Sequence, residues 1–152
     1  MISEVEGYFS VAVSMSTCNV VMCGSFSPIT YAHLRSLELA KDCLLSRGVE
    51  VKKGLLSPVS DGYKKNDLVG AAHRVAMINA AVDGSPWIQI STWEVEQPGF
   101  CLTYLALQEI QKSTDPDVPL RLVAGADLLA SMNTPNVWSD SDVRQFNSEA
   151  YH

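Results

Sequence analysis

The sequence predicts an α/β fold built around a doubly wound parallel sheet. Short apolar runs alternate with stretches in which apolar residues recur at helical spacing. Strands are expected at residues 19–23, 49–56, 87–91 and 120–124, and helices at residues 30–46, 70–82, 100–111 and 128–132. Strands that are separated by single helices favour parallel pairing with right-handed crossovers, so a Rossmann-like arrangement is expected.

The composition restricts both the number of domains and the class of partner. A chain of 152 residues suits one domain with a substantial core. Lys and Arg number 11 against 17 Asp and Glu, and the net charge of −6 argues against general binding to nucleic acids or anionic membranes. The four cysteines lack the spacing of a metal site and favour a reducing, intracellular compartment, cytoplasmic or nuclear.

The chain divides into three parts by its pattern. Residues 1–17 contain two acidic residues and no Lys or Arg, so they fit neither a secretory nor a mitochondrial leader and are assigned to an amino-terminal extension. Residues 18–140 carry the alternating strand and helix signals of one domain. Residues 141–152 do not continue this pattern and form an atypical tail.

The residues that follow the first strand, CGSFSPITYAHL at 23–34, form the most informative motif. Gly24 lets the backbone approach a bulky ligand, and Pro28 stiffens the loop. Thr30 is expected to cap the next helix, whose amino-terminal N–H groups favour a phosphate. His33 lies in the first turn of that helix and can lean toward the same anion. The stretch therefore predicts a phosphate site beyond the carboxyl end of a strand, where ligands bind in such sheets.

This stretch resembles the G-x-F-x-P-x-T/H-x-x-H signature of the nucleotidylyltransferase superfamily. It looks most like the eukaryotic-type nicotinamide mononucleotide (NMN) adenylyltransferases. The signature positions are occupied by Gly24, Phe26, Pro28, Thr30 and His33. The resemblance runs from about Val20 to Trp138 and implies the nucleotidylyltransferase fold. It also implies that Gly24, Phe26 and His33 bind ATP.

A second element, SPVSDGYKK at residues 57–65, follows the second strand. It is similar to the SPV-x-D-x-Y-K-K segment of the same family, in which the second lysine engages the phosphate of the mononucleotide. The resemblance implies that Lys65 and Ser25 bind this phosphate and that Lys65 and His33 are the catalytic residues. A lysine suits this role because its ammonium group is a compact charge on a flexible stem. A solvated surface loop is the alternative interpretation.

His73 and Arg74 open the next predicted helix and match a pair of residues in the family. We interpret both side chains as structural. A His and an Arg near the start of a helix more often form hydrogen bonds or ion pairs within the fold than act on a substrate.

The segment after the third strand resembles the WE....W/Y..T element that lines the nicotinamide pocket in the family. The resemblance assigns Trp93, Phe100 and Thr103 to this pocket, with Phe100 in the place of the more usual Trp or Tyr. Thr103 falls three residues after Phe100 and is expected on the same helical face, where it can meet the carboxamide. An aromatic face attracts a pyridinium ring by about 0.5–2 kcal/mol.

Two further matches follow the fourth strand. Gly125 and Asp127 correspond to the family's GAD element, which contacts the adenosine side of ATP. Asp127 can alternatively serve as the amino-terminal cap of the helix that begins at Leu128. The run PNVW at residues 135–138 resembles the family's PNLW, so Val137 and Trp138 are expected to hold the carboxamide and to form the second wall of the nicotinamide pocket.

The resemblance implies direct, in-line transfer of AMP from ATP to NMN or nicotinic acid mononucleotide, which yields NAD or its deamido form and pyrophosphate. His33 would stabilise charge at the α-phosphate of ATP. Mg²⁺ would arrive chelated by ATP, because no carboxylate cluster predicts dedicated protein ligands. Members of this family are often oligomeric, so a homo-oligomer is among the expected partners.

After Trp138 the sequence reads SDSDVRQFNSEAYH and contains nothing similar to the family's late ISSTxxR-like element, which binds the ATP phosphates. The comparison therefore predicts a carboxyl-terminally truncated fold, with the last part of the family's sheet missing. Two alternatives stay open. One is a catalytically weak or inactive nucleotide-binding or chaperone-like form, and the other is a nucleotidylyltransferase for another small substrate.

Overall fold

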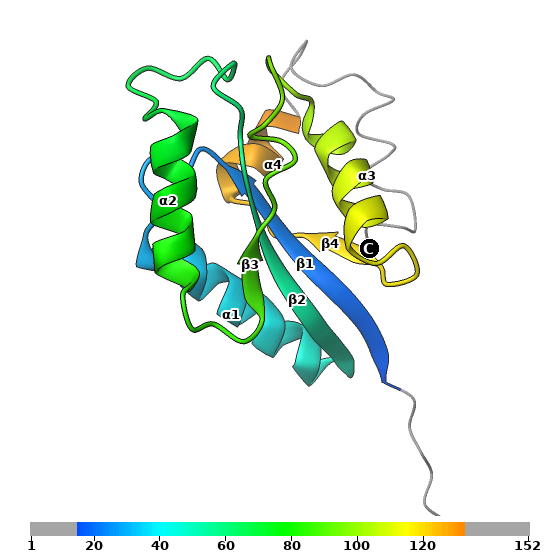
Figure 1. Ribbon diagram of the computed structural model, residues 1–152. Coiled ribbons are helices and arrows are strands. Elements are labelled where there is room, and N and C mark those ends of the chain that lie inside the picture. The colour runs from blue at the N-terminus through cyan, green and yellow to red at the C-terminus, as the bar shows by residue number, and fades with distance from the viewer. Residues whose placement is uncertain (1–14, 133–152) are drawn as a thin grey trace, which may run out of the picture.

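Two long strands, β1 (Ser16–Gly24) and β2 (Val49–Pro58), form the centre of the sheet in the computed structural model, which describes residues 15–132 (Figure 1). The shorter strands β3 (Ile88–Ile90) and β4 (Leu120–Leu122) pair with them in the order β3-β2-β1-β4. Every pair is parallel. The chain therefore reverses its direction of winding between β1 and β4, which confirms the predicted doubly wound sheet.

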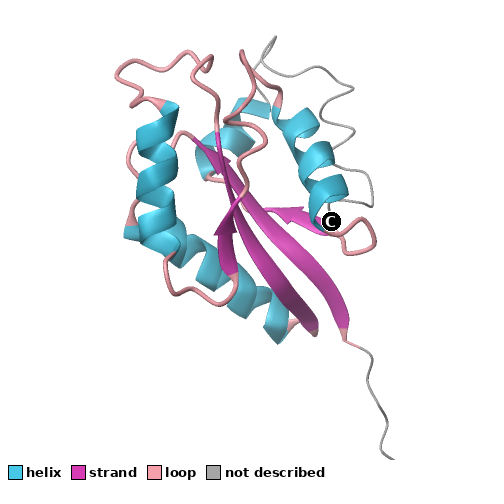
Figure 2. Cartoon of the chain, in the orientation of Figure 1, coloured by secondary structure: helices cyan, strands magenta, loops and turns pink. Residues whose placement is uncertain are grey.

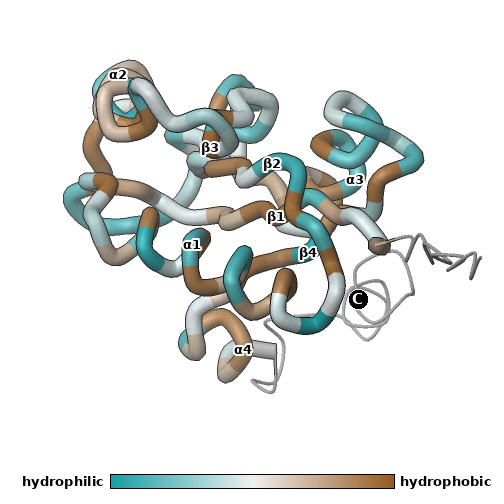
Figure 3. Tube along the Cα trace, turned by 90° about the horizontal axis from the view of Figure 1, so that it is seen from below, coloured by the Kyte–Doolittle hydropathy of each residue, from teal (hydrophilic) through white to brown (hydrophobic). Residues whose placement is uncertain are grey.

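Helices cover both faces of this sheet (Figures 1 and 2). They are α1 (Tyr31–Ser46), α2 (Ala71–Val82), α3 (Thr103–Thr114) and α4 (Ala126–Met132). In the view of Figure 3 the strands lie between α1 and α4 at the lower left and α3 at the right. Within residues 15–132, no helix is long and apolar enough to cross a membrane.

The central strands are apolar on both sides because both faces of the sheet are covered. Val20 and Leu56 pack with Leu37 of α1 and with α2, whereas their neighbours Val21 and Leu55 pack with α3 on the opposite face. Successive side chains of a strand point to opposite faces, so continuous apolar runs serve two hydrophobic clusters at once. This burial explains the continuous apolar pairs in the middle of β1 and in the second half of β2, whereas β3 and β4 alternate apolar and polar residues.

The ends of several elements differ from the prediction. Strand β1 begins at Ser16 rather than at residue 19, so it takes in the last two residues of the segment assigned to an extension. Ser16 pairs with Val49 of β2, and this pairing extends the strand beyond its apolar run. Helix α3 begins at Thr103 rather than at Phe100, and Leu102 before it is extended.

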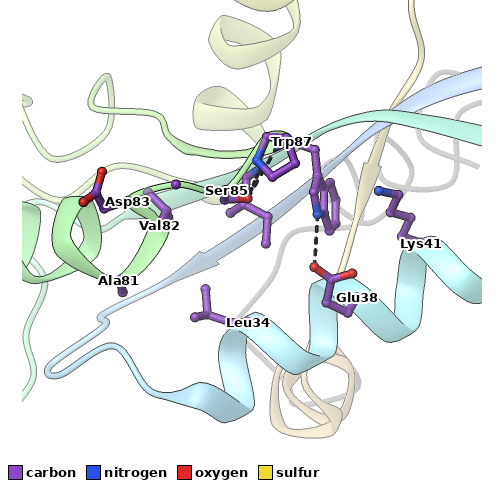
Figure 4. A pocket seen from close by; sticks show the side chains of 11 residues that line it. Leu34, Glu38, Lys41, Ala81, Val82, Asp83, Ser85 and Trp87 are labelled. Atoms are coloured by element: carbon purple, nitrogen blue, oxygen red, sulfur yellow. Dashed lines mark hydrogen bonds between the residues drawn. The ribbon is translucent and has the colours of Figure 1, made fainter.

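A hollow of about 540 Å³ lies beside the amino-terminal end of β3, between α1 and the end of α2 (Figure 4). The Trp87 ring forms one wall, donates a hydrogen bond from Nε1 to Glu38 at 3.0 Å and lies 4.3 Å beneath the Lys41 ammonium. The ring also packs on Gly54 of β2, where a Cβ atom would lie 2.6 Å from the ring carbon Cζ3. This hollow is at the opposite end of β3 from the predicted phosphate site.

Candidate functional site

The carboxyl ends of β1 and β2 bring the first two sequence motifs together. Cys23 pairs with Ser57 and Gly24 with Pro58 in the sheet register. Just beyond the strands, the Val59 N–H donates to the Gly24 carbonyl oxygen at 3.0 Å. The glycine turn and the lysine-bearing segment therefore begin side by side, next to the point between β1 and β4 at which open α/β sheets bind ligands.

The buried ring of Phe26 packs against the glycine turn. Its side chain is 1% exposed, and its backbone φ of 42° lies in the left-handed region that disfavours side chains. The ring lies 3.4 Å from the place that a Cβ atom of Gly24 would occupy and meets the His33 ring edge-on at 5.1 Å between centroids. A ligand can therefore reach Phe26 through its backbone and not through its buried ring.

Thr30 fixes the orientation of the His33 imidazole. His33 Nδ1 accepts the backbone N–H of Thr30 at 3.0 Å and lies 2.8 Å from the Thr30 hydroxyl oxygen. Because a backbone N–H can only donate, Nδ1 carries no proton in this arrangement and Nε2 carries the proton of the neutral ring. Thr30 is the residue before α1, as predicted, and it leaves His33 with an N–H donor at Nε2.

Ser25 and Lys65 meet although they are 40 residues apart in the sequence. Lys65 Nζ donates a hydrogen bond to Ser25 Oγ at 2.9 Å, and the Lys65 side chain is exposed. The structure thus places the two residues predicted to bind one phosphate within reach of a single anion. The neighbouring Lys64 is also exposed.

Arg74 is 0% exposed and acts within the fold, as predicted. Its guanidinium donates to the carbonyl oxygens of Val69 at 2.6 Å and Ser25 at 3.1 Å, and to Asp61 Oδ1 at 2.9 Å. The bond from Arg74 holds the pKa of the Asp61 carboxyl below its usual value. Arg74 therefore ties the glycine turn to the lysine-bearing segment, while His73 is exposed.

Phe100 lies outside helix α3 and is positioned by Tyr63. The Phe100 side chain is 61% exposed, and its ring stacks on that of Tyr63 with 6.3 Å between the centroids and 26° between the planes. The expectation that Phe100 and Thr103 share a helical face is wrong, because Thr103 is the first residue of α3. Both residues, like the half-buried Trp93, nevertheless follow β3 at the same end of the sheet.

Gly125 and Asp127 lie beyond β4. The Leu128 and Leu129 N–H groups donate to the Gly125 carbonyl oxygen, so α4 begins before Asp127. The alternative role of Asp127 as the residue that precedes and caps this helix is therefore wrong. The Asp127 carboxylate lies over Gly125, in space that a side chain at Gly125 would fill, and both residues are exposed. Val137 and Trp138 lie outside the described residues.

Two residues that support the site, Tyr63 and Glu94, were not assigned a role from the sequence. Tyr63 is part of the matched SPVSDGYKK run, and Glu94 follows Trp93 in the matched WE pair, so both signals were present. Their roles depend on contacts with distant segments, which the sequence pattern does not reveal.

Comparison with known proteins gives a consistent result. Residues 21–148 match the cytidylyltransferase-like family. A nicotinamide/nicotinic acid mononucleotide adenylyltransferase of Oryza sativa is 42% identical over 132 residues, which are 82% of this chain and 53% of that protein. One of Schizosaccharomyces pombe is 41% identical over 139 residues, which are 82% of this chain and 38% of that protein. The chain thus spans about half or less of the length of these curated relatives.

A solved structure shares the fold. The nicotinic acid mononucleotide adenylyltransferase of Plasmodium falciparum, complexed with NaAD, superposes with a TM-score of 0.57 at 21% sequence identity. The superposition covers 82% of this chain and 58% of that one. This likeness confirms the predicted Rossmann-like fold of the nucleotidylyltransferases.

Proposed function

This chain belongs to the cytidylyltransferase-like family, and from that premise we propose that it transfers the adenylyl group of ATP to NMN or nicotinic acid mononucleotide. The products are NAD or its deamido form, and pyrophosphate. The observation that carries the proposal is the 2.9 Å hydrogen bond between Lys65 and Ser25 beside the amino terminus of α1. The names of the relatives from rice and fission yeast support the same substrates.

The reaction needs alignment of two phosphates more than covalent chemistry from the protein. Ser25 and Lys65 hold the 5′-phosphate of the mononucleotide, one oxygen of which attacks the α-phosphorus of ATP. A new P–O bond forms as the bond to the bridging oxygen breaks, and pyrophosphate leaves with the electron pair. His33 donates its Nε2–H to the α-phosphate, where negative charge builds up in the transition state.

The two substrates bind beyond different strands of the sheet. Gly24, Gly125 and Asp127 contact the ATP side, next to the point at which the sheet reverses its winding. Phe100, Trp93 and Thr103 form the nicotinamide side. The family resemblance also assigns Val137 and Trp138 to it, and both lie outside the described residues. Mg²⁺ enters bound to the ATP phosphates and neutralises part of their charge. Among residues 15–132, no group of three or more His, Cys, Asp or Glu side chains could hold a metal ion.

The charge of the chain and the state of its cysteines support proposals for its partners and its cellular compartment. A net charge of −6 disfavours nucleic acids and anionic membranes as partners, while Lys65 supplies a local positive charge for a small anion. All four cysteines are free thiols, which suits the reducing conditions of the cytoplasm or nucleus. A homo-oligomer is the remaining expected partner, and sedimentation tests it.

The test is direct measurement of product. The full chain is incubated with Mg-ATP and either mononucleotide, and the dinucleotide and pyrophosphate are quantified in parallel. We expect both products, and we expect His33→Ala to reduce kcat by about 10²–10³-fold, the usual effect of losing one preorganised donor. CTP in place of ATP serves as the nucleotide control. A folded chain that binds ATP without forming product would refute turnover and favour the nucleotide-binding alternative.

A further inference from the structure

A buried carboxylate lies directly behind the proposed site. Glu94 follows β3, is 2% exposed and accepts a hydrogen bond at Oε2 from Ser57 Oγ at 2.8 Å. Ser57 is itself buried near the end of β2, where it pairs with Cys23 of β1. One side chain thus reaches from the loop after β3 to the carboxyl ends of the two central strands.

This carboxylate is costly to bury. Burial raises the pKa of Glu94, while the Ser57 hydrogen bond and the positive charge of Arg74 on α2 act in the opposite direction. The thiols of Cys23 on β1 and Cys101 before α3 also face it, and burial followed by the Glu94 charge raises the pKa of each. A buried charge of this kind needs hydrogen bonds to be tolerated. The bond to Ser57 is therefore a strong constraint on where the Glu94 segment can lie.

Two further contacts join the same segments at their exposed end. We call residues 57–65 the phosphate segment and residues 92–103 the ring segment. Ser60 Oγ donates to the Gly99 carbonyl oxygen at 2.5 Å, and Tyr63 stacks on Phe100. At Gly62, a Cβ atom would lie 2.6 Å from the carbonyl carbon of Gly99, so the two backbones approach as closely as glycine allows. In Figure 1 both segments lie at the top of the view, beyond the carboxyl ends of β2 and β3.

We propose that Glu94 is a positioning residue that, through Ser57, sets the separation between the phosphate segment and the ring segment. A mononucleotide spans a limited range of distances between its 5′-phosphate and its pyridine ring. Lys65 and Phe100 lie on different segments, so both ends of the substrate are held only when the two segments keep a matching separation. The inference rests on the proposed function for the identity of this substrate.

The kinetic test compares Glu94→Ala, Glu94→Gln and Ser57→Ala in the full chain, with Glu96→Gln as the matched control on the same segment. Glu96 is exposed, so its variant should behave as the wild type. Glu94→Ala and Ser57→Ala should raise KM for the mononucleotide about tenfold and leave KM for ATP within about twofold. Glu94→Gln should stay within about threefold for both substrates, because its amide oxygen still accepts the Ser57 hydroxyl.

A second readout does not depend on turnover. Amide hydrogen exchange should become faster in both segments of Glu94→Ala and of Ser57→Ala, and should be unchanged in Glu94→Gln and Glu96→Gln. If Glu94→Ala does not fold, Ser57→Ala still decides the question. Equal increases in both KM values, a loss of kcat alone, or a Glu94→Gln as impaired as Glu94→Ala would overturn the proposal.

The two proposals fail in different ways. A folded wild-type chain that makes no dinucleotide contradicts the proposed function, while the exchange rates still show whether Glu94 couples the segments. Normal dinucleotide formation with unchanged exchange in Glu94→Ala and Ser57→Ala contradicts the role of Glu94 and leaves the proposed function intact.

Discussion

Replacement of Arg74 by methionine should both destabilise the fold and weaken the site. This one side chain joins α2 to the lysine-bearing loop and to the glycine turn. The guanidinium donates to Val69 at the end of the lysine-bearing loop, to Asp61 within it and to the carbonyl of Ser25 in the glycine turn. Methionine fills a similar volume but donates no hydrogen bond. The variant therefore removes the hydrogen bonds while it keeps most of the packing.

The magnitude follows from the exposure of each partner. The Asp61 side chain is 60% exposed, so its carboxylate regains water when the arginine is lost, and the ion pair itself contributes little. The bonds to the Val69 and Ser25 carbonyls are partly buried, and each contributes about 1.5–3 kcal/mol because the donor is charged. Removal of arginine also removes the cost of burying its charge. The net loss in the free energy of unfolding should be about 2–4 kcal/mol.

Denaturant unfolding at pH 7 measures this loss, and steady-state kinetics measures the effect on the site. Arg74→Lys should lose nearly as much stability as the methionine variant, since one ammonium group cannot reach three acceptors in the geometry of the guanidinium fork. Arg35→Met, an exposed position on α1, is the control and should be neutral. An Arg74→Met protein within about 0.5 kcal/mol of the wild type would refute the reasoning, because surface substitutions produce changes of that size.

Three other changes are expected to have distinct effects. Lys65→Ala should raise KM for the mononucleotide about tenfold or more in steady-state assays, whereas Lys64→Ala should change it by less than about twofold. Gly54→Ala should lower the free energy of unfolding by about 1–3 kcal/mol, because its Cβ atom meets the Trp87 ring at 2.6 Å; a normal denaturation curve would contradict this. Burial raises the pKa of Glu94 above its ordinary 4.5, so stability present below pH 4.5 is lost as the pH rises through the folded pKa. Thermal melts at increasing pH above 4.5 check this. The melting temperature of Glu94→Gln should rise relative to that of the wild type as the pH rises, and a difference in melting temperature that does not change with pH would contradict a buried charge at Glu94.

Most of the fold is visible in the sequence because its strands are buried on both faces. The apolar runs around Val20 and Leu55 cannot be placed elsewhere, and helical spacing marks the segments that cover them. The ends of the elements are less visible. Ser16 belongs to β1 because it pairs with Val49, and Phe100 lies outside α3, packed on Tyr63. Both outcomes depend on partners that are distant in the sequence.

The family resemblance assigned the site residues, and the topology explains why Ser25 and Lys65 meet, since the carboxyl ends of β1 and β2 lie side by side. Ser25 and Lys65 lie 40 residues apart, and no local pattern links them. The role of Glu94 could not be found in this way, and for Arg74 the sequence predicted a structural role but neither its partners nor its complete burial. Charged residues in loops and at helix starts are usually solvated, so their burial becomes apparent once the surrounding segments are in place.

The distribution of buried polar groups gives a physical reason for this difficulty. Among residues 15–132, five polar or charged side chains are buried, namely Asn19, Ser57, Ser60, Arg74 and Glu94. Ser57 lies at the end of β2, Ser60 and Glu94 lie in the loops after β2 and β3, and Arg74 lies in the first turn of α2. A protein selected for stability alone would place apolar side chains there, since buried polar groups are costly and apolar replacements are often neutral or stabilising. We interpret their concentration at one end of the sheet as stability given up for the proposed geometry between the phosphate segment and the ring segment. Alanine substitutions at Ser57 and Glu94 should therefore impair binding of the proposed mononucleotide at temperatures well below those at which the fold is lost.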